Sequence, residues 1–194
     1  YGFNTIEIPS KLNIPITYSE LVNPELVRNL ISDLLSYAGF DEAINNSLIK
    51  GEYSTLIPEI DSTQNVVLIN PLSKDLDVMR QSLIFSGLEN IAYNQNRKQN
   101  DVKLYEFGKT YHKFSSDYLE KEHLQLLVRG RLQSENWNSN ADQVDFFFIK
   151  KQVESILYKL GIKNIKHKQN NSFGFEDGLI YSVNKRRLVA FGKI

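Results

Sequence analysis

The sequence has no cysteine in 194 residues, so it carries neither a disulfide framework nor a thiolate metal site. It also lacks any apolar run near the roughly 20 residues that a membrane-spanning helix needs. No basic segment followed by an apolar one marks its start, as a secretory signal would. These absences exclude several classes of secreted and membrane protein, and we expect a soluble, cytoplasmic protein that binds no membrane.

Excess charge of either sign is also missing, because Lys plus Arg and Asp plus Glu both total 23. No global field therefore draws the chain toward nucleic acid or an anionic surface, and any such contact must be local. Hydrophobic residues make up 41% and charged residues 24%, which is typical of an ordinary globular domain. The length fits one domain with a sizeable core.

Motifs for phosphate binding, metal binding and nucleophilic catalysis are absent as well. No Gly-x4-Gly-Lys-Ser/Thr, Gly-x-Gly-x-x-Gly or Gly-x-Ser-x-Gly string occurs, and the three histidines show no metal-ligand spacing. Asp75 and Asp77 offer two carboxylates, but a magnesium site needs further ligands, so we interpret them as part of a solvated turn. We expect no cofactor in this chain.

Helix signals are clear at three places. Asn23 as N-cap, Pro24 at the first helical position and Gly39 after the end predict a helix up to Ala38. Its broad apolar face contains Leu26, Val27, Leu30, Ile31, Leu34, Leu35 and Ala38. A second helix, capped by Ser82 and running to Arg97, has a stripe of Ile84, Leu88, Ile91, Ala92 and Gln95.

The third helix follows Asp145 and ends at Gly161. Its inward positions are Phe146, Ile149, Val153, Ile156, Leu157 and Leu160. β-forming residues predict strands over 42–50, 66–69, 102–111, 124–131, 165–168, 179–183 and 188–191. We expect the polar stretch 114–122 to connect two paired strands and 184–187 to form a tight turn. Without regular βαβ alternation, the fold class is α+β, with an antiparallel sheet flanked by helices.

Glu106 stands between Tyr105 and Phe107 in a predicted strand, where a buried carboxylate needs a partner to offset its desolvation. Arg80 is the candidate. We expect the two to form an ion pair inside the sheet.

The C-terminal third is locally basic. Six cations contribute to it: Lys163, Lys166, Lys168, Lys185, Arg186 and Arg187. They either contact phosphates or protect a hairpin and its edge strand from pairing with other chains.

Short motifs along the chain occur in the order of one known family. They are Asn70-Pro71-Leu72-Ser73, Met79-Arg80, Ser82-Leu83, Asn94, Asn96-Arg97 and Leu104 to Tyr111, with Tyr1 to Asn4 before them and Val144 to Phe147 after. This pattern resembles the β subunit of bacterial-type phenylalanyl-tRNA synthetases. The resemblance implies a class II aminoacyl-tRNA synthetase-like fold. It further implies that residues 1–20 are the exit arm of a preceding module and that 21–194 form a C-terminally truncated, catalytic-like core domain.

The same resemblance gives the first helix a role. It is similar to class II motif 1, which builds the subunit interface, with Leu26, Leu30 and Leu34 as interface candidates. A helix that covers its own sheet has the same apolar pattern, so both interpretations remain open.

In the catalytic α subunit of this family, an arginine that grips ATP phosphates follows the counterpart of Gly108 to Tyr111. Here the position is His112. A histidine is mostly neutral near pH 7 and lacks the bidentate fork of arginine, so we expect phosphate clamping to be lost.

The resemblance therefore implies a catalytically silent domain of a phenylalanine-tRNA ligase. Its partners would be the α subunit, a second αβ pair in an (αβ)2 enzyme, and tRNA(Phe), with ATP and magnesium bound elsewhere. The alternatives are a stand-alone RNA-binding module and a small carboxylate-activating ligase of related fold.

Overall fold

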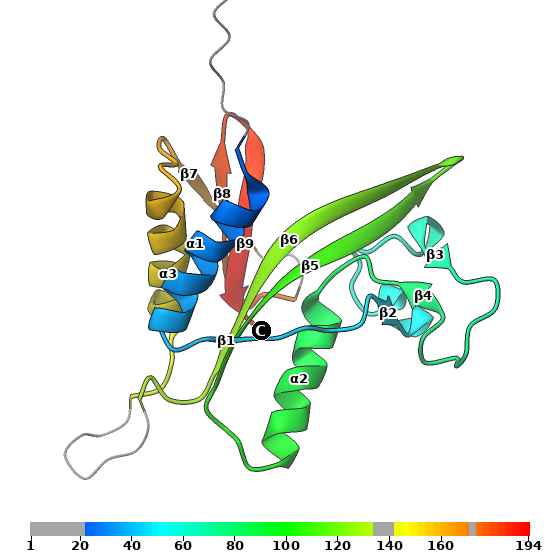
Figure 1. The fold of residues 1–194 in the computed structure, drawn as a ribbon, viewed down its shortest axis with the longest axis horizontal. Coiled ribbons are helices and arrows are strands. Elements are labelled where there is room, and N and C mark those ends of the chain that lie inside the picture. The colour runs from blue at the N-terminus through cyan, green and yellow to red at the C-terminus, as the bar shows by residue number, and fades with distance from the viewer. Residues whose placement is uncertain (1–21, 134–141, 171–173) are drawn as a thin grey trace, which may run out of the picture.

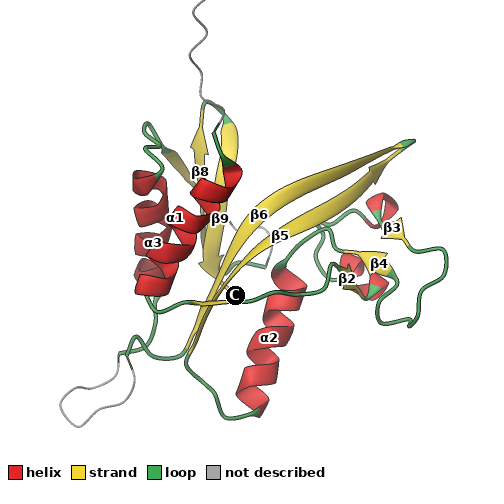
Figure 2. Cartoon of the chain, in the orientation of Figure 1, coloured by secondary structure: helices red, strands yellow, loops and turns green. Residues whose placement is uncertain are grey.

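The computed structural model describes residues 22–133, 142–170 and 174–194. The arm expected over residues 1–20 therefore lies outside the described residues. Within the described part, three α-helices and three three-stranded sheets form an α+β fold (Figures 1 and 2), which confirms the predicted class. No helix in those ranges is long and apolar enough to cross a membrane.

A long hairpin is the centre of the fold. β5 (Val102–Phe114) pairs antiparallel with β6 (Asp117–Arg129) along its whole length, and β1 (Asp41–Glu42) joins β5 in parallel. The connection predicted over 114–122 is wrong, because both strands continue to a two-residue turn. The polar residues there belong to exposed strand surface: Lys109 and Glu120 form an ion pair of 2.6 Å across the two strands.

α1 (Pro24–Tyr37) and α3 (Phe146–Lys159) cover one face of this hairpin and run antiparallel to each other (Figure 1). The N-caps predicted for these two helices are confirmed: the Asn23 side chain accepts a hydrogen bond from Glu25 N, and the Asp145 side chain accepts one from Phe148 N. Ser82, the cap predicted for the second helix, instead lies one residue before the N-cap position, which Leu83 occupies. The core beneath the helices contains Ile31, Leu35, Phe40, Tyr105 and Ile156.

The C-terminal sheet has the strand order β7 (Lys166–Gln169), β8 (Asp177–Val183) and β9 (Arg186–Lys193), all antiparallel. α3 packs on it through a second core cluster of Val153, Leu157, Tyr181 and Phe191. The predicted tight turn is confirmed, with Asn184 and Lys185 both in the left-handed region, at φ of 49° and 66°.

A small lobe contains β2 (Leu48–Ile49), β4 (Val78–Met79) and β3 (Val66–Val67), with the 3₁₀ helices η2 (Gly51–Thr55) and η3 (Ser62–Gln64). The single strand predicted over 42–50 is wrong. β1 and β2 share that range but belong to different sheets. The chain turns between them, where Asn46 Oδ1 accepts a hydrogen bond of 3.0 Å from Leu48 N.

α2 (Ile84–Asn96) packs on the opposite face of the hairpin. The predicted apolar stripe is right in part: Ile84 and Ile91 are half-buried, but Leu88 is 38% exposed. The fully buried residues of this helix are instead Phe85, Ser86 and Gly87. Gly87 accounts for the difference. A Cβ atom at this position would lie 2.2 Å from Leu127 Cδ1, so the missing side chain lets the helix backbone approach the sheet.

Candidate functional site

The candidate site lies on the hairpin face that α2 covers. Strand residues alternate between faces, so the even positions of β5 and the odd positions of β6 point away from α1 and α3. Glu106, Thr110 and His112 therefore share one face with His123 and Gln125. The sequence candidates Glu106 and His112 lie on this face, six positions apart on one strand.

Arg80 and Glu106 form the ion pair expected from the sequence. Arg80 Nη1 lies 2.8 Å from Glu106 Oε1, with only 3% and 4% of the two side chains exposed. Nη1 makes no hydrogen bond of good geometry within the described residues, so this contact is chiefly electrostatic. Arg80 Nε donates to Lys109 O at 3.1 Å. The Arg80 backbone also bonds Ser47 O and Tyr111 N at 2.9 Å each, which joins the small lobe to β5.

Two asparagines complete the surroundings of Glu106. Asn45 Nδ2 donates to Glu106 Oε2 at 2.7 Å, and Asn90 Nδ2 donates to Asn45 Oδ1 at 3.0 Å. Sequence reasoning missed both, because they are far from Glu106 along the chain and lie in no recognisable motif. The carboxylate thus meets a cation and an amide, which suits a structural role.

Gly108 lies against this ion pair. A Cβ atom there would approach Arg80 Nη2 and Leu83 Cδ2 to 2.4 Å each. The sheet face at this point is therefore filled by the chain's own side chains, and no open space remains for a ligand.

His112 is half-buried farther along β5, and its ring stacks on Phe114 with centroids 6.3 Å apart. Burial, together with the charge of Lys121, lowers the pKa of His112 below its ordinary value of 6.5. The neutral imidazole is therefore favoured at pH 7, and this position holds no fixed cation. On the neighbouring strand, His123 Nε2 lies 3.0 Å from Thr110 Oγ1, and burial and Lys121 likewise lower the pKa of His123.

The described surface includes two small hollows. One, of about 210 Å³, lies in the small lobe beside Ile60 and Phe85, and the other, of about 160 Å³, lies beside Glu106. Both are smaller than the roughly 300 Å³ at which pockets for small molecules begin. Neither hollow has His112 or an arginine in its lining.

Carboxylates and histidines do not gather into a metal site in the described part of the chain, where no group of three such side chains occurs. Asp75 lies 3.3 Å from the ammonium group of Lys50, and Asp77 Oδ1 accepts a hydrogen bond of 2.8 Å from Gly51 N. The two carboxylates thus hold the loops of the lobe: Asp75 is exposed, as expected for a solvated turn, but Asp77 is half-buried.

The three interface candidates on α1 have different surroundings. Leu26 is 66% exposed, Leu30 is partly buried, and Leu34 packs against the core beneath the helix. Together with the buried Ile31 and Leu35, this shows that α1 covers its own sheet. The outer side of the helix, which includes Leu26, is free for a second contact within the described structure.

Several known proteins are similar to this chain in sequence. The model of the phenylalanyl-tRNA synthetase beta chain CLM domain matches residues 8–194. The phenylalanine-tRNA ligase beta subunit of Bacteroides fragilis is 38% identical over 172 residues, which are 84% of this chain but 21% of that protein. Its counterpart in Listeria monocytogenes is 32% identical over 169 residues, 86% of this chain and 21% of that protein. The chain spans about a fifth of the length of these curated relatives.

Solved structures agree on the fold. The pyrrolysyl-tRNA synthetase of Desulfitobacterium hafniense superposes with a TM-score of 0.62 at 13% identity, over 86% of this chain and 57% of that one. An ATP phosphoribosyltransferase regulatory subunit/histidyl-tRNA synthetase from Bacillus halodurans superposes with a TM-score of 0.57 at 13% identity, over 82% of this chain and 42% of that one. The fold is thus that of class II aminoacyl-tRNA synthetases. Together, the matched model, the identity to the beta subunits and the shared fold show that this chain belongs to the phenylalanyl-tRNA synthetase beta chain CLM domain family.

Proposed function

We propose that this chain is a catalytically silent domain of a phenylalanine-tRNA ligase β subunit. It packs on the α subunit in a cytoplasmic (αβ)2 enzyme that attaches phenylalanine to tRNA(Phe) with ATP. Family membership and identity to β subunits support this assignment. The chain spans about a fifth of those relatives, and our proposal assigns the sites for ATP and magnesium to other parts of the enzyme.

The observation that carries the proposal is the state of His112. A phosphate clamp needs a cation that stays charged, and an arginine supplies one with two parallel donors. Burial and Lys121 favour the neutral form of His112. Arg80 is not a substitute, because it is buried and paired with Glu106. The described hollows likewise give no support to a stand-alone carboxylate-activating ligase.

The outer surface of the α1 and α3 layer suits packing on a partner. Leu26 and Tyr37 of α1 are exposed, as are Phe147 and Tyr158 of α3. The helices run antiparallel and come close where α1 ends and α3 begins (Figure 1), and there Phe40 stacks on Phe148. Exposed apolar and aromatic side chains on adjacent helices are typical of subunit interfaces.

Co-purification with the α subunit tests this surface. Leu26→Asp combined with Tyr37→Asp should abolish the association, because two unpaired carboxylates would be desolvated in the contact. Neither side chain belongs to the core, so the variant should remain folded, as circular dichroism can verify. The matched control is Ile69→Asp combined with Leu72→Asp, at exposed positions of the small lobe. Association of the α1 variant at the level of the parent chain would contradict the proposed packing.

A further inference from the structure

The C-terminal sheet separates its charges toward two ends. Residues 161–194 contain seven Lys or Arg and two acids, Glu176 and Asp177. Both acids lie at one end of the sheet, where Glu176 pairs with Lys193 at 3.3 Å and Asp177 is opposite Lys193 in the β8–β9 register. The other six cations form what we call the basic end: Lys163, Lys166, Lys168, Lys185, Arg186 and Arg187.

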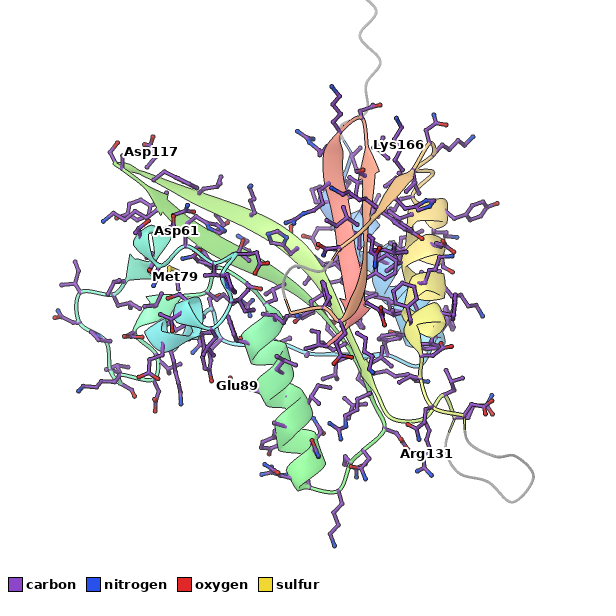
Figure 3. All side chains as sticks on the ribbon, turned by 180° about the vertical axis from the view of Figure 1, so that it is seen from behind. Asp61, Met79, Glu89, Asp117, Arg131 and Lys166 are labelled. Carbon is purple, nitrogen blue, oxygen red and sulfur yellow. The ribbon has the colours of Figure 1, made fainter. Side chains whose placement is uncertain are left out.

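Strand register brings the cations of the basic end together. Lys166 is paired with Ser182, and Ser182 is paired with Arg187 on the other side, so one row across the sheet carries two cations. Arg186 is opposite Val183, and Lys185 occupies the adjacent turn. Figure 3 shows Lys166 at this end of the sheet. At about 3.3 Å per residue, β8 separates the hairpin tip at Lys185 and Arg186 from the two acids by roughly 20 Å, whereas Lys168, paired with Ile180, lies about half as far along the sheet.

The cations of the basic end face solvent. Lys166, Lys168, Lys185 and Arg186 are exposed, and none of them forms an ion pair with a described residue. Lysines on β7 also protect an edge strand from pairing with other chains. Arg186 begins β9, the other edge strand, but edge protection does not explain Lys185, which belongs to the hairpin turn.

The sheet holds these cations on a rigid base. One face of the sheet packs on α3 through Tyr181 and Phe191, and the tight turn at Asn184 and Lys185 fixes the hairpin tip. Cations at fixed spacing suit a polymer that presents phosphates at regular intervals. A membrane surface is the less suitable partner, because its usual binding element is an amphipathic helix with a basic face.

We propose that the basic end binds the phosphate backbone of RNA. The contacts are independent of base sequence and hold the nucleic acid in position. This deepens the proposed function, because it rests on the chain being part of a tRNA ligase and takes the RNA to be its tRNA. It assigns to this sheet a role separate from the packing surface on α1.

Fluorescence anisotropy of labelled tRNA, titrated with the 194-residue chain at several salt concentrations, tests the proposal. The variant is Lys166→Ala, Lys185→Ala and Arg186→Ala together. The control is Lys74→Ala, Lys113→Ala and Lys151→Ala, which removes the same charge at exposed positions elsewhere. We expect the basic-end variant to bind at least about tenfold more weakly at low salt, with the control close to the parent. The slope of log K against log salt should fall by about 2, since each lost phosphate contact contributes roughly 0.7 to 0.9.

Three outcomes would overturn the inference. They are an equal loss in both triple variants, no binding of tRNA by the parent chain, and binding to phosphatidylserine-containing vesicles in place of tRNA. Co-purification of the basic-end variant with the α subunit keeps the two proposals apart. If the basic-end variant still associates with the α subunit but no longer binds RNA, both proposals are supported. The association of the Leu26 and Tyr37 variant tests the packing surface alone.

Discussion

The guanidinium group of Arg80 and the carboxylate of Glu106 lie 2.8 Å apart beneath α2, shielded almost entirely from solvent. A buried charge is strongly unfavourable alone, and its partner offsets most of that penalty. Since the Arg80 backbone bonds both Ser47 and Tyr111, the pair also fixes the small lobe against the hairpin. The fold therefore depends on both members being present.

Glu106→Gln should leave Arg80 as an unpaired buried cation. We expect the free energy of unfolding to fall by about 3 to 5 kcal/mol, as measured by urea denaturation. The control is Glu120→Gln, which removes an ion pair with Lys109 on the exposed part of the same hairpin and should change stability little. Similar effects of the two substitutions would contradict the structural role of the buried pair.

Gly108→Ala tests the close approach beside this pair. The added methyl group would meet both Arg80 and Leu83, and the ion pair with Glu106 limits how far Arg80 can move. We expect a loss of about 1 to 3 kcal/mol in the same assay, which is the usual range for overpacking. An unchanged midpoint of unfolding would show that α2 and β4 can shift away from the sheet.

Local signals predicted the helices well. Asn23 and Asp145 cap α1 and α3 as expected, because a side-chain cap depends on residues within one turn. The face of α2 was not predictable in this way. Its burial depends on Gly87 meeting Leu127 of a strand far along the chain, and hydrophobic spacing alone favours Leu88.

The strands and the site could likewise be predicted only in part from the sequence. Residues 117–122 are polar because they extend beyond the helices that cover the hairpin, so composition indicates a loop where a strand exists. The Arg80–Glu106 pair was predictable, since a carboxylate between two aromatic residues needs a cation. Asn45 and Asn90 were not, because an amide donor can come from any part of the chain that folding brings near.

Tyr181→Phe should change how stability depends on pH. Tyr181 Oη donates to Glu154 Oε1 at 2.8 Å, and this bond lowers the pKa of Glu154. A carboxyl group with a lower pKa in the folded state adds stability above its unfolded pKa, and that stability is lost as the pH falls. The variant should therefore be less stable at pH 7, and its difference from the parent should narrow below a pH of about 4.5, the ordinary value for Glu154.

At alkaline pH, the stability that the same pair adds depends on pH in the opposite direction. Burial, and to a smaller extent the hydrogen bond to Glu154, raises the pKa of Tyr181 from 10.0 to about 12. A phenol with a raised pKa adds stability below its unfolded value, and this is lost as the pH rises toward 12. Urea denaturation across both ranges measures the effect, with the exposed Tyr158→Phe as control. A gap between parent and Tyr181→Phe that stays constant with pH would contradict the coupling.

Catalytic silence is tested by pyrophosphate exchange. His112 is held neutral and Arg80 is buried against Glu106, so neither of these two residues offers ATP a charge, and the chain alone should show no phenylalanine-dependent exchange. His112→Arg would restore one charge, but Arg80 and Leu83 still fill the sheet face at Gly108, so we expect no exchange from this variant either. The α subunit assembled with the chain is the positive control. Exchange by the chain alone would contradict the proposed catalytic silence.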